Sequence, residues 1–406
     1  MKPLTIAVIG GGAAGLVASA LLTSYENCRV LLFERNDRLG KKLSATGNGQ
    51  GNITHRALSV DAYFAQSALP KSKVARMLSL YDDDSVCAFF QTLGVLTDTD
   101  VKGRVYPSGR QASAVTDALR FSLGKNVDVR LQTKVTWLEK QANGFMLTAE
   151  TQDGVCHFFA DYVLLCTGGK AAKNFGTDGS AYALAEGLGH SRTALCPSLV
   201  QLKTDVKAIR TLKGIRVADG GVTAYVNGEK KATLQGDIIF TDYGVSGDAI
   251  FRISAYIADK IDKGVTLSLD LLPRYTQEEL ISAMRNKRER FPELGFCELL
   301  GGTLNNQVGR AVLKTVKDGD IPAAAKAVKA FPLTVTGTLG FDYAQVTKGG
   351  IPLDETDDTL QSTLIQGLYF AGETLDIDGA CGGYNLQWAY TSARIVVDAL
   401  IEKIGK

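Results

Sequence analysis

The sequence TIAVIGGGAAGLVASALLTSYENCRVLLFE, residues 5–34, decides the fold class. An apolar run over residues 5–9 predicts a buried strand, and the glycines and alanines that follow predict a turn. Residues 16–24 suit a helix, and residues 30–33 predict a second strand. Strand, helix and strand in this order form a βαβ unit, in which the two strands lie parallel. We therefore expect an α/β protein built on a parallel sheet.

The turn inside this unit carries the pattern G-x-G-x-x-G, formed by Gly10, Gly12 and Gly15, and Glu34 closes the second strand. In such a pattern the first glycine permits a tight turn, the second lets a pyrophosphate approach the backbone, and the third packs the helix on the strand. The helix N-terminus favours negative charge, and the Glu34 carboxylate can accept a hydrogen bond from a ribose hydroxyl. The sequence therefore predicts one site for an ADP-containing dinucleotide.

The composition excludes several classes of protein. The chain has 406 residues, of which 45% are hydrophobic and 22% charged, as is typical of a globular protein with a large core. Its 45 basic and 43 acidic residues give a net charge of +2 and are dispersed, so we expect no surface for nucleic acid or anionic membrane. The seven cysteines include no C-x-x-C pair and the three histidines are isolated. We therefore expect no metal site and a reduced, cytoplasmic protein.

The N-terminal segment superficially resembles a secretory signal peptide, because residues 4–25 carry no charge and follow Lys2. The three consecutive glycines at residues 10–12 interrupt the segment where a signal peptide would continue as an apolar helix. We therefore interpret it as part of the βαβ unit. No other stretch resembles a membrane span.

The pattern changes along the rest of the chain. Residues 127–159 alternate between apolar and polar with Asn-Gly and Asp-Gly pairs between them, which predicts an antiparallel meander. Residues 162–166 predict a buried strand that returns to the parallel sheet. Strands between residues 196 and 270 predict a β-rich domain, whereas residues 276–330 and 384–401 have helical spacing.

These patterns divide the chain into three predicted domains. The nucleotide-binding domain is discontinuous and comprises residues 1–195 and 341–406. A β-rich middle domain comprises residues 196–272 and 332–340, and residues 273–331 form a helical insert.

Three further segments can contact a dinucleotide. Residues 40–52, GKKLSATGNGQGN, bring two lysines and a run of backbone amides towards the expected pyrophosphate. Gly372 and Glu373 follow a strand, and residues 382–387, GGYNLQ, open the last helix. The N-terminus of that helix would stabilise negative charge on a reduced flavin ring, which a nicotinamide does not require.

Over nearly its whole length the chain resembles the HI0933-like flavoprotein family. Members of this family include aminoacetone oxidases and the clostridial enoate and enone reductases of the bile-acid pathway. The resemblance is carried by residues 10–15, 40–54, 103–107 (GRVYP), 167–169 (TGG), 240–247 (FTDYGVSG), 372–379 (GETLDIDG) and 382–387.

The resemblance implies tightly bound FAD in a discontinuous, glutathione-reductase-like Rossmann domain, with an inserted β-rich domain and a small helical subdomain. It implies that Glu34 and the first glycines hold the ADP and that the backbone of Val135 meets the adenine. It also implies that Glu373 contacts the ribityl chain and that residues 383–385 meet the flavin pyrimidine. The residues expected to contact FAD are Gly10, Gly12, Ala13, Ala14, Gly15, Glu34, Arg35, Lys41, Lys42, Thr46, Gly47, Asn48, Gly49, Asn52, Val135, Thr167, Gly168, Gly169, Gly372, Glu373, Asp376, Gly383, Tyr384 and Asn385.

The chain departs from the family pattern at residues 49–52, at Asp242, and at Asp248, where a proline is usual. The family often has Gly-Arg-Cys-Asn where residues 49–52 read GQGN, and Thr-His where this chain has Thr241 and Asp242. An arginine is a fixed positive charge and hydrogen-bond donor, so its loss near the flavin predicts a lower flavin potential or altered substrate recognition.

Two side chains are candidates for proton transfer, because a flavin itself carries the hydride. Tyr384 lies in the turn expected to abut the flavin, where its phenol can donate to an enolate, although a packing role is equally open. His55 follows the glycine-rich loop and can act near the ring, with a solvent-facing position as the alternative.

We expect an FAD-dependent oxidoreductase that transfers hydride from reduced flavin to an electron-poor C=C bond of a small organic substrate, with NAD(P)H as reductant. Residues 378–389 resemble the reductase branch more than the oxidase branch. Two alternatives stay open: an FAD-dependent amine oxidase of the aminoacetone type that uses O2, and a flavin-carrying protein that modifies or binds RNA. The expected partner is a small-molecule substrate, without nucleic acid or membrane.

Overall fold

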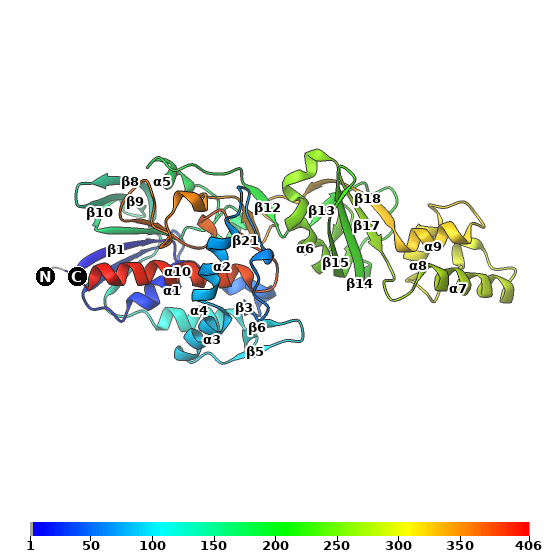
Figure 1. Cartoon of the computed structure of the whole chain (residues 1–406), viewed down its shortest axis with the longest axis horizontal. Coiled ribbons are helices and arrows are strands. Elements are labelled where there is room, and N and C mark those ends of the chain that lie inside the picture. Colours follow the sequence, from blue (N-terminus) through cyan, green and yellow to red (C-terminus); the bar gives the residue numbers. More distant parts are fainter. Residues whose placement is uncertain (1–2, 406) are drawn as a thin grey trace. The chain divides into compact units, whose positions relative to one another are not determined.

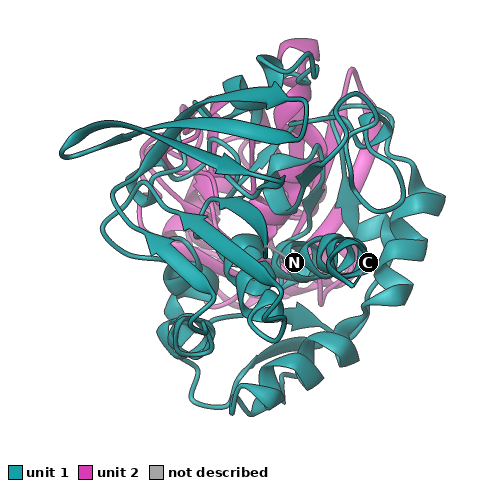
Figure 2. Cartoon of the chain, turned by 90° about the vertical axis from the view of Figure 1, so that its left-hand side faces the viewer, with its two compact units in different colours: residues 1–196, 346–406 teal, residues 197–345 magenta. Residues whose placement is uncertain are grey.

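The computed structural model describes residues 3–405, which form two compact units. The first unit holds the chain up to Cys196 and again from Val346 onward, and the second holds Pro197–Gln345 (Figure 2). The first unit is thus discontinuous in sequence. The predicted helical insert lies within the second unit, and its independence as a third domain stays a prediction.

A five-stranded parallel sheet forms the centre of the first unit, in the order β20-β11-β1-β2-β7. Its strands are β1 (Leu4–Ile9), β2 (Cys28–Phe33), β7 (Val127–Arg130), β11 (Tyr162–Leu165) and β20 (Leu368–Phe370). Helix α1 (Ala13–Leu22) connects β1 to β2, so the predicted βαβ unit and the α/β class are confirmed.

The predicted meander is wrong at its start. β7 pairs with β2 in parallel, with Val127 opposite Val30, and so belongs to the central sheet. The antiparallel meander contains only β8 (Lys134–Gln141), β9 (Gly144–Thr151) and β10 (Gly154–Ala160). β7 is an edge strand of the central sheet and only partly buried, so its residues alternate like those of a hairpin strand.

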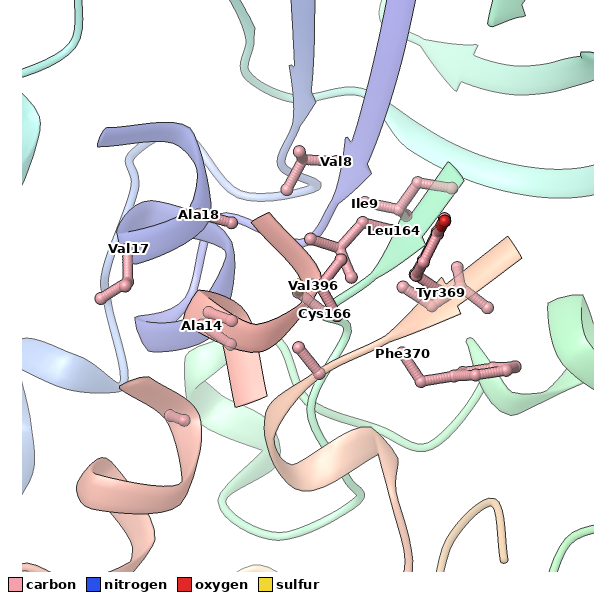
Figure 3. Close-up of a cluster of buried hydrophobic side chains, with 14 of the residues drawn as sticks. Val8, Ile9, Ala14, Val17, Ala18, Leu164, Cys166, Tyr369, Phe370 and Val396 are labelled. Carbon is pink, nitrogen blue, oxygen red and sulfur yellow. The ribbon is translucent and has the colours of Figure 1, made fainter. Parts of the chain in front are cut away.

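Apolar side chains fill the space between the parallel sheet and two helices. Helix α10 (Tyr384–Ile404) packs against α1, and the two run side by side in Figure 1. Figure 3 draws Ala14 and Ala18 of α1 and Val396 of α10 in the same cluster of buried side chains, and small side chains such as alanine let two helices approach closely. The packing fixes the N-terminal ends of both helices, which frame the site described below.

Smaller elements surround this core. Antiparallel strands form the sheets β3-β6-β5 and β21-β4, and β12 pairs with β19. Their bounds are β3 (Thr54–His55), β4 (Tyr63–Phe64), β5 (Thr97–Thr99), β6 (Arg104–Pro107), β12 (Cys196–Ser198), β19 (Val346–Lys348) and β21 (Asp378–Gly379). The remaining helices of the first unit are α2 (Lys71–Leu80), α3 (Asp83–Thr92), α4 (Ala112–Phe121) and α5 (Tyr182–Glu186).

The second unit contains a closed barrel, in the order β13-β16-β15-β14-β17-β18, with its own apolar core. The strands are β13 (Leu202–Thr204), β14 (Arg216–Val226), β15 (Glu229–Phe240), β16 (Gly244–Ser246), β17 (Val265–Asp270) and β18 (Phe331–Thr338). The helices are α6 (Asp248–Ile257), α7 (Gln277–Arg290), α8 (Asn306–Leu313) and α9 (Ile321–Lys329). A β-rich insertion with helices is therefore confirmed. Across residues 3–405, no helix has both the length and the apolar character needed to cross a membrane.

Candidate functional site

The turn between β1 and α1 is shaped by a close approach of backbone to backbone. A Cβ on Gly15 would collide with the carbonyl oxygen of Gly10, so only glycine lets α1 start directly over the strand end. Among the described residues, no atom lies within 4 Å of the place that a Cβ on Gly12 would take. α1 begins at Ala13 without a side-chain cap and without an acidic residue in its first turn. The uncapped helix end therefore faces open space, as a pyrophosphate site requires.

Glu34 lies at the end of β2, beside this turn. Its Oε2 accepts a hydrogen bond of 2.9 Å from the amide of Gly11, and its Oε1 accepts bonds of 2.8 and 2.7 Å from the amide and side chain of Asn36. The carboxylate is 8% exposed. Glu34 thus shapes the glycine turn as well as lying where a ribose acceptor is expected.

Val135 and Arg35, both expected near the adenosine, are placed differently. The chain before Val135 runs along Glu34, because the Thr133 amide donates to the Glu34 carbonyl oxygen at 2.9 Å. Val135 itself is buried at a β-bulge in β8. Arg35 turns instead to the surface and pairs with Asp178 at 2.9 Å. The structure therefore brings Val135, but not the guanidinium of Arg35, towards Glu34.

Residues 40–52 form an irregular loop that leaves the backbone accessible. Thr46 donates through its hydroxyl to the Leu43 carbonyl oxygen at 2.8 Å. Gly47 and Asn48 both have positive φ, 59° and 54°, so the chain reverses locally there. Asn52 donates from its side chain to the carbonyl oxygens of Thr54 and Val105, which makes it an internal support of the loop. No described atom lies within 4 Å of where a Cβ on Gly49 would stand.

Both lysines of this loop are already paired with carboxylates. Lys41 pairs with Asp37 on the surface at 2.7 Å. Lys42 pairs at 2.7 Å with Glu373, so two residues predicted to contact the cofactor from opposite ends of the chain meet directly. The other oxygen of Glu373 accepts a hydrogen bond of 2.8 Å from the Thr347 amide. Each lysine thus has a carboxylate partner, and their position beside the pyrophosphate stays a prediction.

Residues 167–169 and Gly372 close the same region. The Gly168 amide donates to the Thr374 hydroxyl at 3.2 Å. A Cβ on Gly169 would stand 2.8 Å from Oε1 of Glu373, and one on Gly372 would stand 3.1 Å from the Cβ of Ala14. Thr167 lies within 3.4 Å of Thr374, hydroxyl to hydroxyl. The predicted segments therefore converge around Glu373 and the start of α1.

The N-terminus of α10 is formed by a turn held from within. Gly383 has φ of 104°, and a Cβ on it would collide with the Thr54 carbonyl oxygen. Asn385 accepts from the Gly379 amide and donates to the Gly379 carbonyl oxygen, both at 2.8 Å. Asp376, by contrast, is 1% exposed, and both of its oxygens accept hydrogen bonds from the amides of residues 66 and 67. The structure thus gives Asp376 a supporting role rather than a free carboxylate.

The two predicted catalytic side chains meet, but the backbone occupies their polar atoms. The rings of His55 and Tyr384 stack with centroids 4.8 Å apart. Tyr384 donates its hydroxyl to the Ala57 carbonyl oxygen at 3.1 Å, and the Ala57 amide donates to Nδ1 of His55 at 3.0 Å. Burial lowers the pKa of His55 below its usual value of 6.5, which favours the neutral ring. These contacts fix the loop at residues 55–57 against α10.

Tyr106 belongs to the GRVYP segment but is absent from the predicted site residues. Tyr106 is 5% exposed, and the guanidinium carbons of Arg104 and Arg110 lie 5.8 and 4.1 Å from its ring centroid. A Cβ on Gly47 would stand 3.7 Å from the ring edge. The sequence places Arg104 and Arg110 near Tyr106 along the chain, but only the packing shows that both guanidinium groups lie near its ring.

The site as a whole fits FAD. α1 begins with an uncapped N-terminus, and no described atom blocks the space beside Gly12. α10 begins with a second uncapped N-terminus, and Glu373 pairs with Lys42. A pyrophosphate, a polyol chain and a flavin pyrimidine need groups of these kinds. All of these residues belong to the first unit.

Comparison with known proteins gives one family. The chain matches the family model described as "HI0933-like protein Rossmann domain" over residues 4–399. It is 34% identical to a Clostridium scindens protein named 3-dehydro-bile acid delta(4,6)-reductase, over 98% of this chain and 99% of that one. It is 28% identical to an Escherichia coli protein named ribosomal RNA dihydrouridine synthase, over 99% of each chain.

Solved structures agree on the fold. The FrdA chain of E. coli quinol fumarate reductase matches with a TM-score of 0.51 and 15% identity, over 100% of this chain and 71% of that one. The Mycobacterium smegmatis Sdh1 chain gives a TM-score of 0.51 and 17% identity, over 100% of this chain and 69% of its own. At such identities the likeness concerns the fold alone.

Proposed function

The chain belongs to the HI0933-like family, and from that premise we propose that it is an FAD-dependent reductase of an electron-poor C=C bond, with NAD(P)H as reductant. The observation that carries the proposal is the end-to-end identity of 34% with a relative named as a bile-acid reductase. Two C=C bonds at positions 4 and 6 beside a 3-oxo group form a conjugated dienone, which is an extended enone. We therefore propose a conjugated enone on a small organic molecule as the substrate class.

The geometry supports FAD as the cofactor. The turn at Gly12 and the uncapped start of α1 would hold the pyrophosphate, and Glu34 with the strand before Val135 would hold the adenosine. Glu373 would meet the ribityl chain and the N-terminus of α10 the flavin pyrimidine. When bound, FAD supplies hydride transfer between NAD(P)H and the alkene. The protein's own task is to position the substrate, exclude water and supply a proton.

The names of the relatives favour reduction over oxidation. An amine oxidase that uses O2 would share every residue that binds FAD, so the site itself does not separate the two reactions. The relatives at 34% and 28% identity are named for adding hydrogen to a C=C bond. This common chemistry supports a reductase.

A second candidate function is the reduction of uridine in RNA. Proteins of E. coli and Haemophilus influenzae named ribosomal RNA dihydrouridine synthase are 28% and 26% identical to this chain. The C=C bond of uracil is conjugated with a carbonyl group, so it accepts hydride as an enone does. The net charge of only +2 and the higher identity with the bile-acid reductase favour the small substrate.

One anaerobic experiment tests the proposal. The purified protein is saturated with FAD, its yellow two-banded spectrum is recorded, and NADH or NADPH is added until the colour bleaches. The reduced protein is then mixed with a steroid enone that carries a carboxylate, with uridine-containing ribosomal RNA, or with buffer. We expect the enone to restore the colour rapidly and the RNA to act no faster than buffer.

Other outcomes point elsewhere. Restoration by RNA alone would establish the second candidate. Bleaching of the oxidised protein by aminoacetone, with rapid recovery in O2, would establish the oxidase. A protein that takes up no FAD would refute all three.

A further inference from the structure

Tyr106 stands where the two parts of the cofactor site come together. It lies in β6, and β6 pairs with β3 through Val105 and Thr54. The Thr54 carbonyl oxygen in turn touches Gly383 at the start of α10, and Figure 1 shows β3 and β6 near that end of the helix. On its other side the ring reaches Gly47 of the glycine-rich loop. Tyr106 therefore borders both the loop and the turn expected to enclose the flavin.

The hydroxyl of Tyr106 differs from those of the neighbouring buried tyrosines. Tyr63 donates to the Tyr384 carbonyl oxygen, Tyr384 to that of Ala57, and Tyr390 to that of Ser85. Within residues 3–405, the Tyr106 hydroxyl has no hydrogen-bond partner, although the residue is 5% exposed. Some of the hydroxyl surface is nevertheless accessible to solvent, because the hydroxyl is not one of the fully buried, unpaired polar atoms of the described residues. A tyrosine that buries its ring and leaves its hydroxyl accessible is available to a ligand.

Two arginines flank this tyrosine and differ in their own bonding. Arg104 donates to Asp100, with Nη2 at 2.7 Å from the carboxylate. Arg110 is exposed, has a positive φ of 50°, and has no carboxylate partner in the described part of the chain. Its guanidinium carbon is the closer one, at 4.1 Å from the ring centroid. The positive charge of Arg110 near the ring stabilises a phenolate when the phenol gives up its proton.

We propose that Tyr106 is the catalytic acid of the reduction, and this proposal rests on the proposed function. Its hydroxyl donates a hydrogen bond to the carbonyl oxygen conjugated with the C=C bond. Reduced FAD, when bound, would supply the hydride with both its electrons to the β carbon, and Tyr106 gives its proton to the carbonyl oxygen. The resulting enol becomes the saturated ketone in solvent, and the Tyr106 phenolate regains a proton from water.

The electrostatics of the position agree with this role. Burial raises the pKa of Tyr106 above its usual value of 10.0; Arg104 and Arg110 lower it, whereas Asp100 and Cys381 raise it further. The phenol is therefore protonated at neutral pH and ready to donate. The same reasoning disfavours Tyr384, because its proton is engaged with the Ala57 carbonyl oxygen.

The test compares three conservative variants of the FAD-saturated protein: Tyr106→Phe, the control Tyr390→Phe and the rival Tyr384→Phe. We expect Tyr106→Phe to be bleached by NAD(P)H at the wild-type rate, while its reoxidation by cyclohexenone slows by about 100-fold or more, the usual size of a general-acid effect. Tyr390→Phe should change neither rate. The wild-type reoxidation rate should fall at high pH, where Tyr106 loses its proton, and Tyr106→Phe should lack this fall.

A binding measurement tests the hydrogen bond without turnover. Cyclohexanone has the carbonyl group but no C=C bond, and its binding to the oxidised protein is followed by the shift of the flavin absorbance. We expect Tyr106→Phe to bind it about fivefold more weakly, the loss of one net hydrogen bond. Wild-type affinity in Tyr106→Phe, or a greater loss of reoxidation rate in Tyr384→Phe, would overturn the proposal.

The two proposals fail in different ways. If no conjugated alkene reoxidises the reduced wild-type protein, the proposed function is wrong, and the assignment of Tyr106 as the acid of that reduction is overturned with it. If wild type reduces the enone and Tyr106→Phe does so equally well, only the assignment of Tyr106 is wrong.

Discussion

The two ends of the cofactor site are built in different ways. The end around Gly10–Gly15 and Glu34 comes from one continuous βαβ unit, and its contacts, including the hydrogen bond from the Gly11 amide to the Glu34 carboxylate, join elements that are neighbours in sequence. The other end combines His55, Tyr106 and Tyr384, which approach one another only through β3, β6 and the start of α10. Local sequence pattern therefore specifies the first end, and tertiary packing specifies the second.

This difference predicts which property a substitution at each end of the site will change. At the βαβ end a side chain added to Gly10 or Gly15 meets backbone, whereas one added to Gly12 meets open space, so changes there affect folding or nucleotide binding directly. At the α10 end the chemistry depends on single side chains whose hydroxyl or ring can be altered without moving the backbone. We expect substitutions at the first end to act on cofactor content and those at the second to act on rates.

The largest effect is expected for Gly15→Val, whose side chain would collide with the Gly10 carbonyl oxygen. We expect a loss of at least about 3 kcal/mol in the free energy of unfolding, measured by urea titration. Gly12→Ala is the matched control, because its Cβ faces open space and its φ of −83° suits alanine. We expect Gly12→Ala to keep its stability within about 0.5 kcal/mol but to bind FAD about 100-fold more weakly. Equal FAD binding would place the pyrophosphate elsewhere.

A smaller effect is expected for Asn385→Ala at the other end. Asn385 exchanges two hydrogen bonds with Gly379 and so holds the turn that precedes α10. We expect a loss of about 1–3 kcal/mol, since a part-buried amide and carbonyl lose their partners. Cofactor content should fall less than in Gly12→Ala, as measured by the ratio of visible to ultraviolet absorbance. A colourless variant would show that both ends contribute equally to FAD retention.

A third prediction concerns the ion pair between Lys42 and Glu373, which joins the two ends. We expect Lys42→Met to weaken FAD binding about tenfold, because the glycine-rich loop loses its tie to Glu373. Lys71→Met is the control, since the pair of Lys71 with Asp61 is exposed on both sides and contributes little. Isothermal titration of the two apoproteins with FAD compares them. Unchanged affinity in Lys42→Met would mean that the pair is incidental.

The smallest effect is a pH dependence that comes from His55. Burial lowers its pKa in the folded protein below 6.5, so the unfolded chain binds the proton first as the pH falls. Stability present above pH 6.5 should therefore decline as the pH drops from 6.5 towards the folded pKa. His55→Gln should lack this part of the decline, which thermal unfolding between pH 7 and pH 5 measures. An unchanged pH dependence in the variant would assign the decline to other groups.

The sequence predicts elements that have a strong local pattern, but it does not predict which strands or side chains pair across the fold. The βαβ unit and the long C-terminal helix were predicted closely, because glycine pattern and helical spacing are local. β7 was assigned to the meander because an edge strand and a hairpin strand share the same alternation. The pairing of Lys42 with Glu373 was missed because nothing near either residue in sequence reveals the other.

The catalytic candidates show the same limit. His55 and Tyr384 were each singled out by neighbouring motifs, and the structure brings them into contact. Whether a hydroxyl is engaged depends on carbonyl groups elsewhere, such as that of Ala57, which the sequence does not place. Tyr106 therefore emerged only when its hydroxyl could be compared with those of Tyr63, Tyr384 and Tyr390.

Because the first unit is discontinuous, its two segments are synthesised at different times. When residues up to Cys196 have left the ribosome, β11 still lacks its neighbour β20, and α1 lacks α10. The intervening Pro197–Gln345 segment takes on the order of ten seconds to translate at about 5–20 residues per second. During this interval the nascent half-unit exposes an unpaired strand edge and an apolar helix face, a hazard for aggregation. If the barrel folds around its own core before α10 is synthesised, it would shorten the flexible chain between the two parts of the first unit.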